Sequence, residues 1–125
     1  MMKTKLFFAA MMIFAASCSD KNMTKNPDGS FTVNTVELGK EIGGYNGAVP
    51  ISTTIKDDVI QDVTFLPNQE TPDYLERVER GMLPKFKGLP IDRINTIDGV
   101  SGATFTSKAL RRNLEAAANY YKENK

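Results

Sequence analysis

Apolar and polar residues alternate along two neighbouring stretches of the chain, 49–55 and 59–65. Residues two apart in a strand point to the same side, so this period of two predicts two strands that each bury one face. The residues expected on the buried faces are Val49, Ile51, Thr53 and Ile55 in the first strand and Val59, Gln61, Val63 and Phe65 in the second. The polar run Lys56-Asp57-Asp58 between them is typical of a tight turn, so the two stretches predict an antiparallel hairpin.

The pattern before the hairpin is less regular. Phe31 and Val33 alternate with polar residues, and Val36 and Leu38 continue out of step, which predicts an irregular first strand. A glycine-rich segment, 39–47, then leads into the hairpin and contains a single aromatic residue, Tyr45.

After the hairpin, apolar residues recur at the spacing of a helix, at i, i+3 and i+7. This set is Leu75, Val78 and Met82. Thr71 is the expected N-cap, Pro72 suits the first helical position, and Pro84 limits the helix at its carboxyl end.

A longer apolar stripe predicts a closing helix. Its members are Ala109, Leu110, Leu114, Ala117, Ala118 and Tyr121. We expect Thr106 or Ser107 to cap this helix, and a short strand, 93–97, to precede it. The order of elements predicts an α+β fold with a small antiparallel sheet, an inserted helix and a C-terminal helix.

The amino terminus has the pattern of an export signal. Lys3 and Lys5 precede an apolar run, 6–16, that is shorter than the roughly 20 apolar residues that span a bilayer, which predicts a secretory signal peptide. Cys18, the only cysteine, follows directly, and the junction resembles the lipobox of bacterial lipoproteins, in which the cysteine becomes the lipid-bearing amino terminus. A plain signal peptide followed by a free thiol is the alternative.

These assignments divide the chain into three parts: a signal peptide, 1–17, a lipid-anchored flexible spacer, 18–30, and a domain, 31–125. The resemblance to lipoproteins implies export from a bacterial cell. We therefore expect a membrane-anchored protein that faces the periplasm or the cell exterior.

Composition excludes several kinds of chemistry. The chain has no histidine and one cysteine, so Ser-His-Asp and Cys-His mechanisms, an intramolecular disulfide and the common zinc ligand sets are excluded, and we expect no metal site. Removing Lys3 and Lys5 with the signal peptide reduces the 16 basic side chains to 14, against 15 acidic ones. The remaining chain therefore lacks the excess of positive charge that is typical of nucleic-acid-binding proteins. Redox or group-transfer chemistry would therefore need a bound cofactor.

The segment DGVSGATFTS, 98–107, places small and hydroxyl residues just before the closing helix. Backbone N–H groups at a helix amino terminus carry partial positive charge, which favours a bound phosphate. Gly102 and Ala103 leave room for a ligand, and Thr104 offers a hydroxyl beside it. A plain turn that starts a helix is the alternative, and the local pattern does not decide between the two.

The run Asp98-Gly99-Val100-Ser101-Gly102-Ala103-Thr104 resembles the flavinylation motif of the FMN-binding domain family, found in the small flavin subunits of Rnf and sodium-translocating quinone reductase complexes. The resemblance implies that Thr104 carries FMN through a phosphodiester bond, installed from FAD by a dedicated flavin transferase. It also implies cofactor-binding roles for Asp98, Gly99, Ser101, Gly102 and Ala103. Thr106 is a second candidate acceptor, because it is also a hydroxyl near the helix start.

Two further motifs extend the resemblance in the same order along the chain. Gly44-Tyr45-Asn46-Gly47-Ala48-Val49 is similar to the family's entry to the hairpin, and Glu70-Thr71-Pro72 is similar to its motif before the first helix. Three motifs in order cover roughly residues 31–120 and are more specific than any one of them. They imply cofactor-binding roles for Gly44, Tyr45, Glu70 and Thr71.

We hypothesise that the isoalloxazine ring lies across the glycine-rich loop and the turn before the first helix. Tyr45 or Phe105 would pack on a face of the ring, Thr71 would hydrogen-bond its polar edge, and a nearby Glu70 carboxylate would disfavour an anionic reduced flavin. Each residue also has a plainer interpretation. Glu70 would then be a solvated loop carboxylate, Thr71 only a helix cap, and Tyr45 a half-buried aromatic beside a turn.

The sequence therefore predicts an extracytoplasmic electron-transfer protein that carries FMN, as a carrier or redox subunit rather than a stand-alone oxidoreductase. The expected partners are a flavin transferase, a membrane or extracytoplasmic electron donor and acceptor, and the membrane through the lipid anchor. Two alternatives remain: a module that binds FMN or another phosphate ligand without a covalent bond, and a flavin-free structural lipoprotein.

Overall fold

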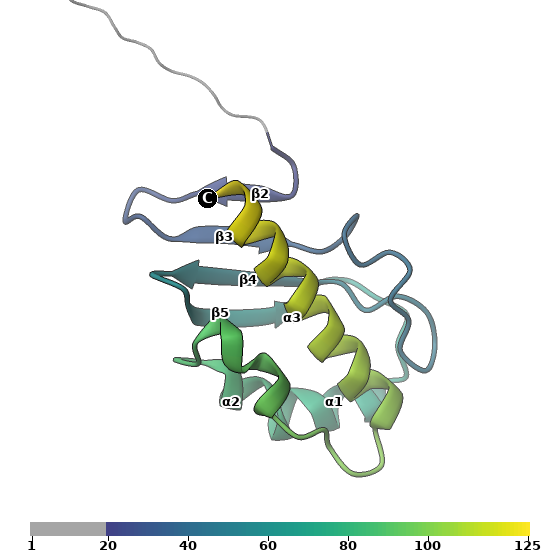
Figure 1. Cartoon of the computed structure of the whole chain (residues 1–125). Helices are drawn as coiled ribbons and strands as arrows, with labels where there is room; N and C mark the ends of the chain where they lie inside the picture. Colours follow the sequence, from purple (N-terminus) through teal and green to yellow (C-terminus); the bar gives the residue numbers. More distant parts are fainter. Residues whose placement is uncertain (1–19) are drawn as a thin grey trace, which may run out of the picture.

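The computed structural model describes residues 20–125, which form an antiparallel sheet with a long helix across one face (Figure 1). The strands β2 (Met23–Lys25), β3 (Phe31–Asn34), β4 (Ile51–Lys56) and β5 (Val59–Phe65) lie side by side in sequence order. The helices are α1 (Pro72–Gly81), α2 (Leu83–Phe86), the 3₁₀ helix η2 (Ile91–Thr96) and α3 (Thr104–Asn124). The predicted α+β fold, with an inserted helix and a C-terminal helix, is confirmed. The predicted signal peptide, 1–17, and Cys18 lie outside the described residues.

The predicted hairpin is formed by β4 and β5. A two-residue turn joins them, in which Asp57 and Asp58 have φ angles of 52° and 64°. A two-residue turn of this hand needs positive φ at both central positions, and aspartate tolerates that conformation better than most residues. The two aspartates are therefore compatible with the backbone conformation of the turn.

A β-bulge changes which residues of β5 face the core. Thr54 pairs with Asp62 whereas Ile55 pairs with Ile60, so Gln61 is an extra residue without a partner on β4. Ile60 is buried at 1 % exposure and Gln61 is exposed. The prediction that Val59 and Gln61 share the buried face with Val63 and Phe65 was wrong, because one extra residue reverses the side to which the preceding residues point.

The strand β2 lies within the segment predicted to be a flexible spacer. It pairs antiparallel with β3, with Met23 opposite Val33 and Lys25 opposite Phe31. In the turn between them, the Asp28 carboxylate accepts hydrogen bonds from the amide and hydroxyl of Ser30, at 2.9 and 2.6 Å. The spacer prediction was therefore wrong for Met23 onwards, because a largely polar segment is stabilised here by main-chain pairing at a sheet edge, with Met23 packed against the core.

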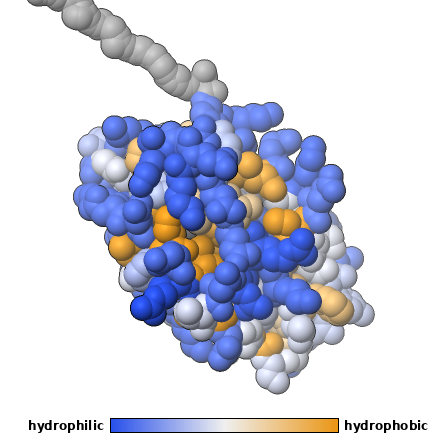
Figure 2. Space-filling model, viewed as in Figure 1, coloured by the Kyte–Doolittle hydropathy of each residue, from blue (hydrophilic) through white to orange (hydrophobic). Residues whose placement is uncertain are grey.

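The core lies between the sheet and α3. Its largest fully buried side chains include Phe86, Ile51, Ile55, Ile60, Met82, Leu110 and Leu114. The predicted apolar stripe of α3, from Ala109 to Tyr121, is buried as expected. In the view of Figure 2 most of the outer surface is hydrophilic, with apolar side chains visible only in patches between polar ones.

The short strand predicted for 93–97 is absent from the described residues, which form the 3₁₀ helix η2 there. Ile91 and Ile94 are its buried residues, at 9 % and 2 % exposure. In a 3₁₀ helix residues three apart lie on one side, so this conformation places both isoleucines in the core. A strand would have turned them to opposite faces. Within residues 20–125, no helix has the length and apolar character of a membrane-spanning segment.

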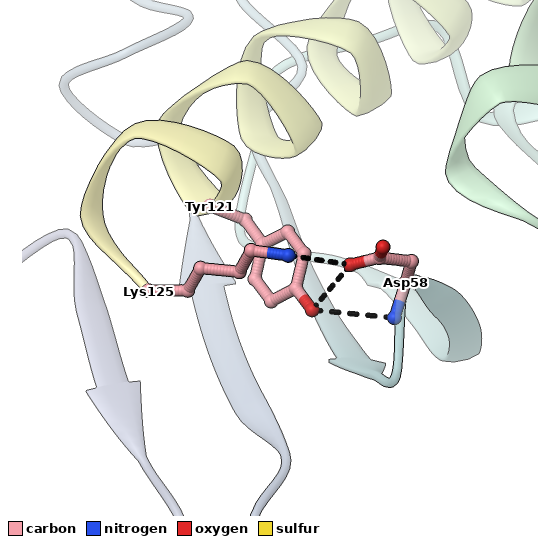
Figure 3. Close-up of polar contacts among 3 residues, drawn as sticks. All are labelled: Asp58, Tyr121 and Lys125. Atoms are coloured by element: carbon pink, nitrogen blue, oxygen red, sulfur yellow. Dashed lines mark hydrogen bonds and ion pairs between the residues drawn. The ribbon is translucent and has the colours of Figure 1, made fainter.

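A polar cluster anchors the carboxyl end of α3 to the β4–β5 turn (Figure 3). The Tyr121 hydroxyl donates to the Asp58 carboxylate at 2.8 Å and accepts from the Asp58 amide at 3.2 Å, and Lys125 Nζ lies 3.0 Å from the same carboxylate. The hydrogen bond from Tyr121, followed by that from Lys125, lowers the pKa of Asp58, and burial is the main cause that raises the pKa of Tyr121. The helix is thus fixed at the end opposite to Thr104.

Candidate functional site

A cavity of about 260 Å³ opens at the amino-terminal end of α3. It is lined by Tyr45, Tyr74, Gly102, Ala103, Thr104, Phe105 and Thr106. These residues come from the glycine-rich loop, from α1 and from the start of α3, which are far apart in the sequence. The fold therefore brings Tyr45 to the hydroxyl and small residues of the 98–107 motif.

The start of α3 has no side-chain cap. The helix begins at Thr104, and Ala103 at the N-cap position has no side chain that can accept a hydrogen bond from the first turn. The prediction that Thr106 or Ser107 caps the helix was wrong, because both lie inside its first turn and are buried. The Ser107 hydroxyl instead accepts a hydrogen bond from the Val100 amide at 2.9 Å. The first N–H groups of the helix therefore remain available to an anion.

Two threonine hydroxyls near this end of α3 have different surroundings. Thr104 is exposed and lines the cavity. Thr106 is fully buried, and its hydroxyl donates a hydrogen bond of 2.5 Å to Glu70 Oε2. The geometry argues against Thr106 as a second acceptor, because its oxygen is inaccessible and already engaged. Thr104 is the hydroxyl that a reactant can reach.

The remaining motif residues shape the turn before Thr104. Gly102 has a φ of 84°, a conformation that favours glycine, and it lines the cavity. A Cβ at Gly99 would lie 2.9 Å from Ser107 Cβ, so glycine is needed there for close packing. Asp98 and Ser101 are exposed on the turn and do not line the cavity.

Glu70 is buried, with 5 % of its surface exposed, and its carboxylate accepts four hydrogen bonds. The amide of Tyr45 and the hydroxyl of Thr106 donate to Oε2 at 2.9 and 2.5 Å. The amides of Asn46 and Thr71 donate to Oε1 at 2.8 and 3.0 Å. The interpretation of Glu70 as a solvated loop carboxylate was therefore wrong. It is a clamp that joins the glycine-rich loop to the starts of α1 and α3.

The charge of Glu70 is stabilised by these donors. Burial raises the pKa of Glu70, but the hydrogen bonds from the Thr106 hydroxyl and the three amides together hold the pKa below its ordinary value. Glu70 is therefore ionised at neutral pH. Its side chain is not among those that line the cavity, but its hydrogen-bond partners Tyr45 and Thr106 are, so the carboxylate lies directly behind the cavity wall.

Thr71 and Gly44 do not line the cavity, and both contact the Glu70 carboxylate instead. Thr71 is the N-cap residue of α1 with Pro72 at the first helical position, as predicted, but its side chain makes no capping hydrogen bond. Its backbone amide is the group that binds, and it binds Glu70. Gly44 lies directly against the Glu70 carboxylate and Val49.

Replacing Gly44 by alanine is expected to destabilise the domain by about 1–3 kcal/mol, because the new Cβ would collide with Glu70 Oε2 and approach Val49 Cγ2 to 2.9 Å. Urea unfolding measures the change. Gly43→Ala is the matched control, since the nearest atom to its added Cβ is the Gly47 carbonyl oxygen at 3.9 Å, an ordinary contact. Equal stabilities of the two variants would show that the packing around Glu70 is looser than the structure has it.

Three aromatic side chains form one wall of the cavity. Tyr45 is 61 % and Phe105 57 % exposed. The Tyr45 ring lies 5.2 Å from the Tyr74 ring, edge to face, and 6.3 Å from the Phe105 ring at a tilt of 35°. Exposed aromatic rings beside a cavity offer an apolar surface for a planar ligand. Tyr74 was not among the predicted site residues, since its place beside Leu75 on an amphipathic helix does not distinguish it from a residue at the edge of the core.

A comparison with protein families matches the FMN-binding domain over residues 44–119, more than half of the chain. The chain belongs to the FMN-binding domain family. The matched segment includes the end of the glycine-rich loop with Tyr45, Glu70, α1 and the start of α3, which contribute the residues that line the cavity or hold them in place. FMN is accordingly the cofactor of this domain. No curated protein and no solved structure matches the chain.

The residues at the cavity fit the parts of FMN. The uncapped N–H groups of α3 suit its phosphate, the left-handed backbone at Gly102 and the small Ala103 leave space beside them, and the aromatic wall suits its ring. Among the residues that the structure describes, no group of three or more acidic, cysteine or histidine side chains is placed to hold a metal ion. FMN supplies its own chemistry, and the cavity residues are placed to bind and position it.

Proposed function

We propose that this protein is an extracytoplasmic electron-transfer protein that carries FMN in a phosphodiester bond to Thr104. The observation that carries the proposal is the contrast between the two hydroxyls within an FMN-binding domain: Thr104 is exposed at an uncapped helix start, whereas Thr106 is buried and bound to Glu70. When bound, FMN supplies a ring that accepts and releases electrons, a chemistry that protein side chains do not provide.

Attachment requires one substitution at phosphorus and no oxidation or reduction. Thr104 Oγ forms a bond to the phosphorus atom nearer the riboflavin part of FAD, the P–O bond of the pyrophosphate breaks, and AMP leaves. The hydroxyl proton passes to the flavin transferase or to solvent. The contribution of this chain is an accessible hydroxyl beside N–H groups that attract the phosphate.

The aromatic wall gives the ring a place close to the protein surface. Tyr45 and Phe105 are each more than half exposed, so a ring that packs against them remains near solvent. Such a position suits exchange of electrons with a donor and an acceptor that approach from outside. The domain would then act as a carrier or redox subunit between two partners.

Export and anchoring belong to the same proposal. The predicted signal peptide and the lipobox-like Cys18 support a lipoprotein that faces the periplasm or the cell exterior. Free FMN lost from an exported protein is not readily replaced, so a covalent bond would retain the cofactor there. A tether at Cys18 would hold the carrier near membrane-bound partners.

The proposal is tested by coexpressing the wild-type chain with a flavin transferase, denaturing the product and separating it from small molecules. We expect the flavin absorbance to stay with the unfolded chain and the intact mass to increase by one FMN less one water. Expression without the transferase is the control and should give the unmodified mass. Release of all flavin on denaturation would replace the proposal with non-covalent binding, and a colourless protein of unmodified mass would leave the flavin-free alternative.

A further inference from the structure

The guanidinium of Arg77, on α1, lies directly against the turn that precedes Thr104. A Cβ built on Gly102 would be 3.4 Å from Arg77 Nη1 and 3.9 Å from its Cζ. Gly102 is two residues before Thr104, so the Cα atoms of the two residues are at most roughly 7 Å apart. An arginine side chain therefore reaches the backbone next to the proposed attachment point.

Arg77 also lines a second cavity, of about 510 Å³. The lining residues are Asp73, Glu76, Arg77, Arg80, Gly81 and Val100. All but Val100 come from α1, at the spacing of one helix face, and Val100 belongs to the motif. Gly102 lines the first cavity and lies next to Arg77, which lines the second.

The charges on this face of α1 are not all paired. Arg80 Nη2 lies 2.8 Å from Glu76 Oε2, one turn earlier on the helix. Within residues 20–125 no carboxylate lies within 4.0 Å of the Arg77 guanidinium. Arg77 thus presents a positive charge and its N–H donors at Gly102 without an acidic partner.

We propose that Arg77 binds the phosphate of the flavin and is the residue that makes this site select FMN over riboflavin. The inference rests on the proposed function and deepens it. A phosphate ester at Thr104 would meet the N–H groups of α3 on one side and the Arg77 guanidinium, which packs on Gly102, on another. The planar guanidinium presents donors that match the oxygens of a phosphate, and hydrogen bonds between charged partners are stronger than neutral ones.

The experiment compares the affinities of FMN and riboflavin for apoprotein, in a Thr104→Ala background that cannot form the covalent bond. The two flavins share the ring and the ribityl chain, and only FMN has the phosphate. Quenching of flavin fluorescence on titration gives both dissociation constants. We expect the parent to bind FMN more tightly than riboflavin, and Arg77→Gln to weaken FMN binding about tenfold with riboflavin binding unchanged.

Arg112→Gln is the matched control, since it removes the same charge from an exposed position of α3. Arg112 lies eight positions after Thr104 on the helix, about 12 Å along the axis, which exceeds the screening length of about 8 Å at physiological salt. We expect its preference for FMN to equal that of the parent. Unchanged riboflavin binding by Arg77→Gln shows in the same titration that the cavity is intact.

Three results would overturn the role of Arg77: a parent without preference for FMN, an Arg77→Gln variant that keeps the preference, or an equal loss in Arg112→Gln. None of these results contradicts the proposed covalent attachment of FMN, because attachment is tested by the mass of the wild-type chain after coexpression. An unmodified wild-type mass would instead contradict the covalent linkage, and the titration would still show whether Arg77 binds the phosphate.

Discussion

Replacing Thr104 by alanine is expected to abolish covalent attachment of FMN completely. The substitution removes the exposed hydroxyl that lines the cavity at the uncapped start of α3, and an alanine methyl cannot form an ester. The Thr106 hydroxyl in the same turn is buried and bound to Glu70. Because Thr104 is exposed, the fold should change in stability by no more than about 0.5 kcal/mol. Intact-mass measurement of the variant after coexpression with a flavin transferase checks the prediction, with wild type beside it.

Two further variants separate the hydroxyl from its position. Thr104→Ser retains the oxygen and should still be modified, whereas Thr106→Val removes the neighbouring hydroxyl and should leave the site of attachment unchanged. Thr106→Val should be less stable than wild type, since the Glu70 carboxylate loses one of its four donors. A mass gain that survives Thr104→Ala would move the bond to another residue, and Ser101, exposed in the same turn, would be the first to examine.

Those parts of the fold that depend on local periodicity could be predicted from the sequence. The alternation in 51–55 corresponds to the buried face of β4, and the stripe from Ala109 to Tyr121 corresponds to the buried face of α3. In each case the core contacts one side of a regular element, so the period of the element appears directly in the sequence. The hairpin turn was also predictable, because its conformation restricts the residues that can occupy it.

The elements that were missed depend on contacts made elsewhere in the chain. β2 exists because β3 offers it a partner, and its own residues are mostly polar. The bulge at Gln61 shifts the period of a strand by one residue, and the 3₁₀ helix at Ile91–Thr96 has a period of three rather than two. A pattern search assumes that the period continues, so it assigns such segments to the wrong face or the wrong element.

The candidate site divides in the same way. The motif around Thr104 is contiguous, so its small residues and hydroxyls were visible in the sequence as one group. Three of the four donors to the Glu70 carboxylate belong to Tyr45, Asn46 and Thr106, which lie 24 to 36 positions away along the chain. Arg77 likewise meets Gly102 only because α1 packs beside the start of α3. Contacts between residues so far apart follow no fixed separation along the sequence, so they become visible only in the folded structure.

The resulting arrangement makes one buried carboxylate responsible for both the fold and the site. Glu70 holds Tyr45, which belongs to the aromatic wall, and Thr106, which belongs to the first turn of α3. The Glu70 side chain therefore helps to fix the two sides of the cavity relative to each other. Weakening this clamp should reduce stability and loosen the cavity together.

Glu70→Gln is accordingly expected to lower the free energy of unfolding by about 2–3 kcal/mol at neutral pH. A glutamine amide has one accepting oxygen and one donating nitrogen, so at least one amide now bound to the carboxylate would face another donor in a buried position. Urea unfolding measures the loss. Glu41→Gln makes the same change at an exposed carboxylate and should stay within about 0.5 kcal/mol of wild type.

The pH dependence of this difference identifies its cause. Burial acts to raise the pKa of Glu70, but its four hydrogen bonds hold the pKa in the folded state below the ordinary value of 4.5. Its stabilising contribution is therefore complete above about pH 4.5 and is lost as the pH falls through the lower, folded-state pKa.

Asp28 and Asp58 also have lowered pKa values, but both are present in wild type and in Glu70→Gln, so their contributions cancel in the difference between the two proteins. The gap in stability between wild type and Glu70→Gln should thus be constant from pH 7 to 5 and shrink below about 4.5. A gap that persists unchanged into strong acid would mean that the glutamine acts by altered packing, and that the charge of Glu70 does not hold the loop and the helices together.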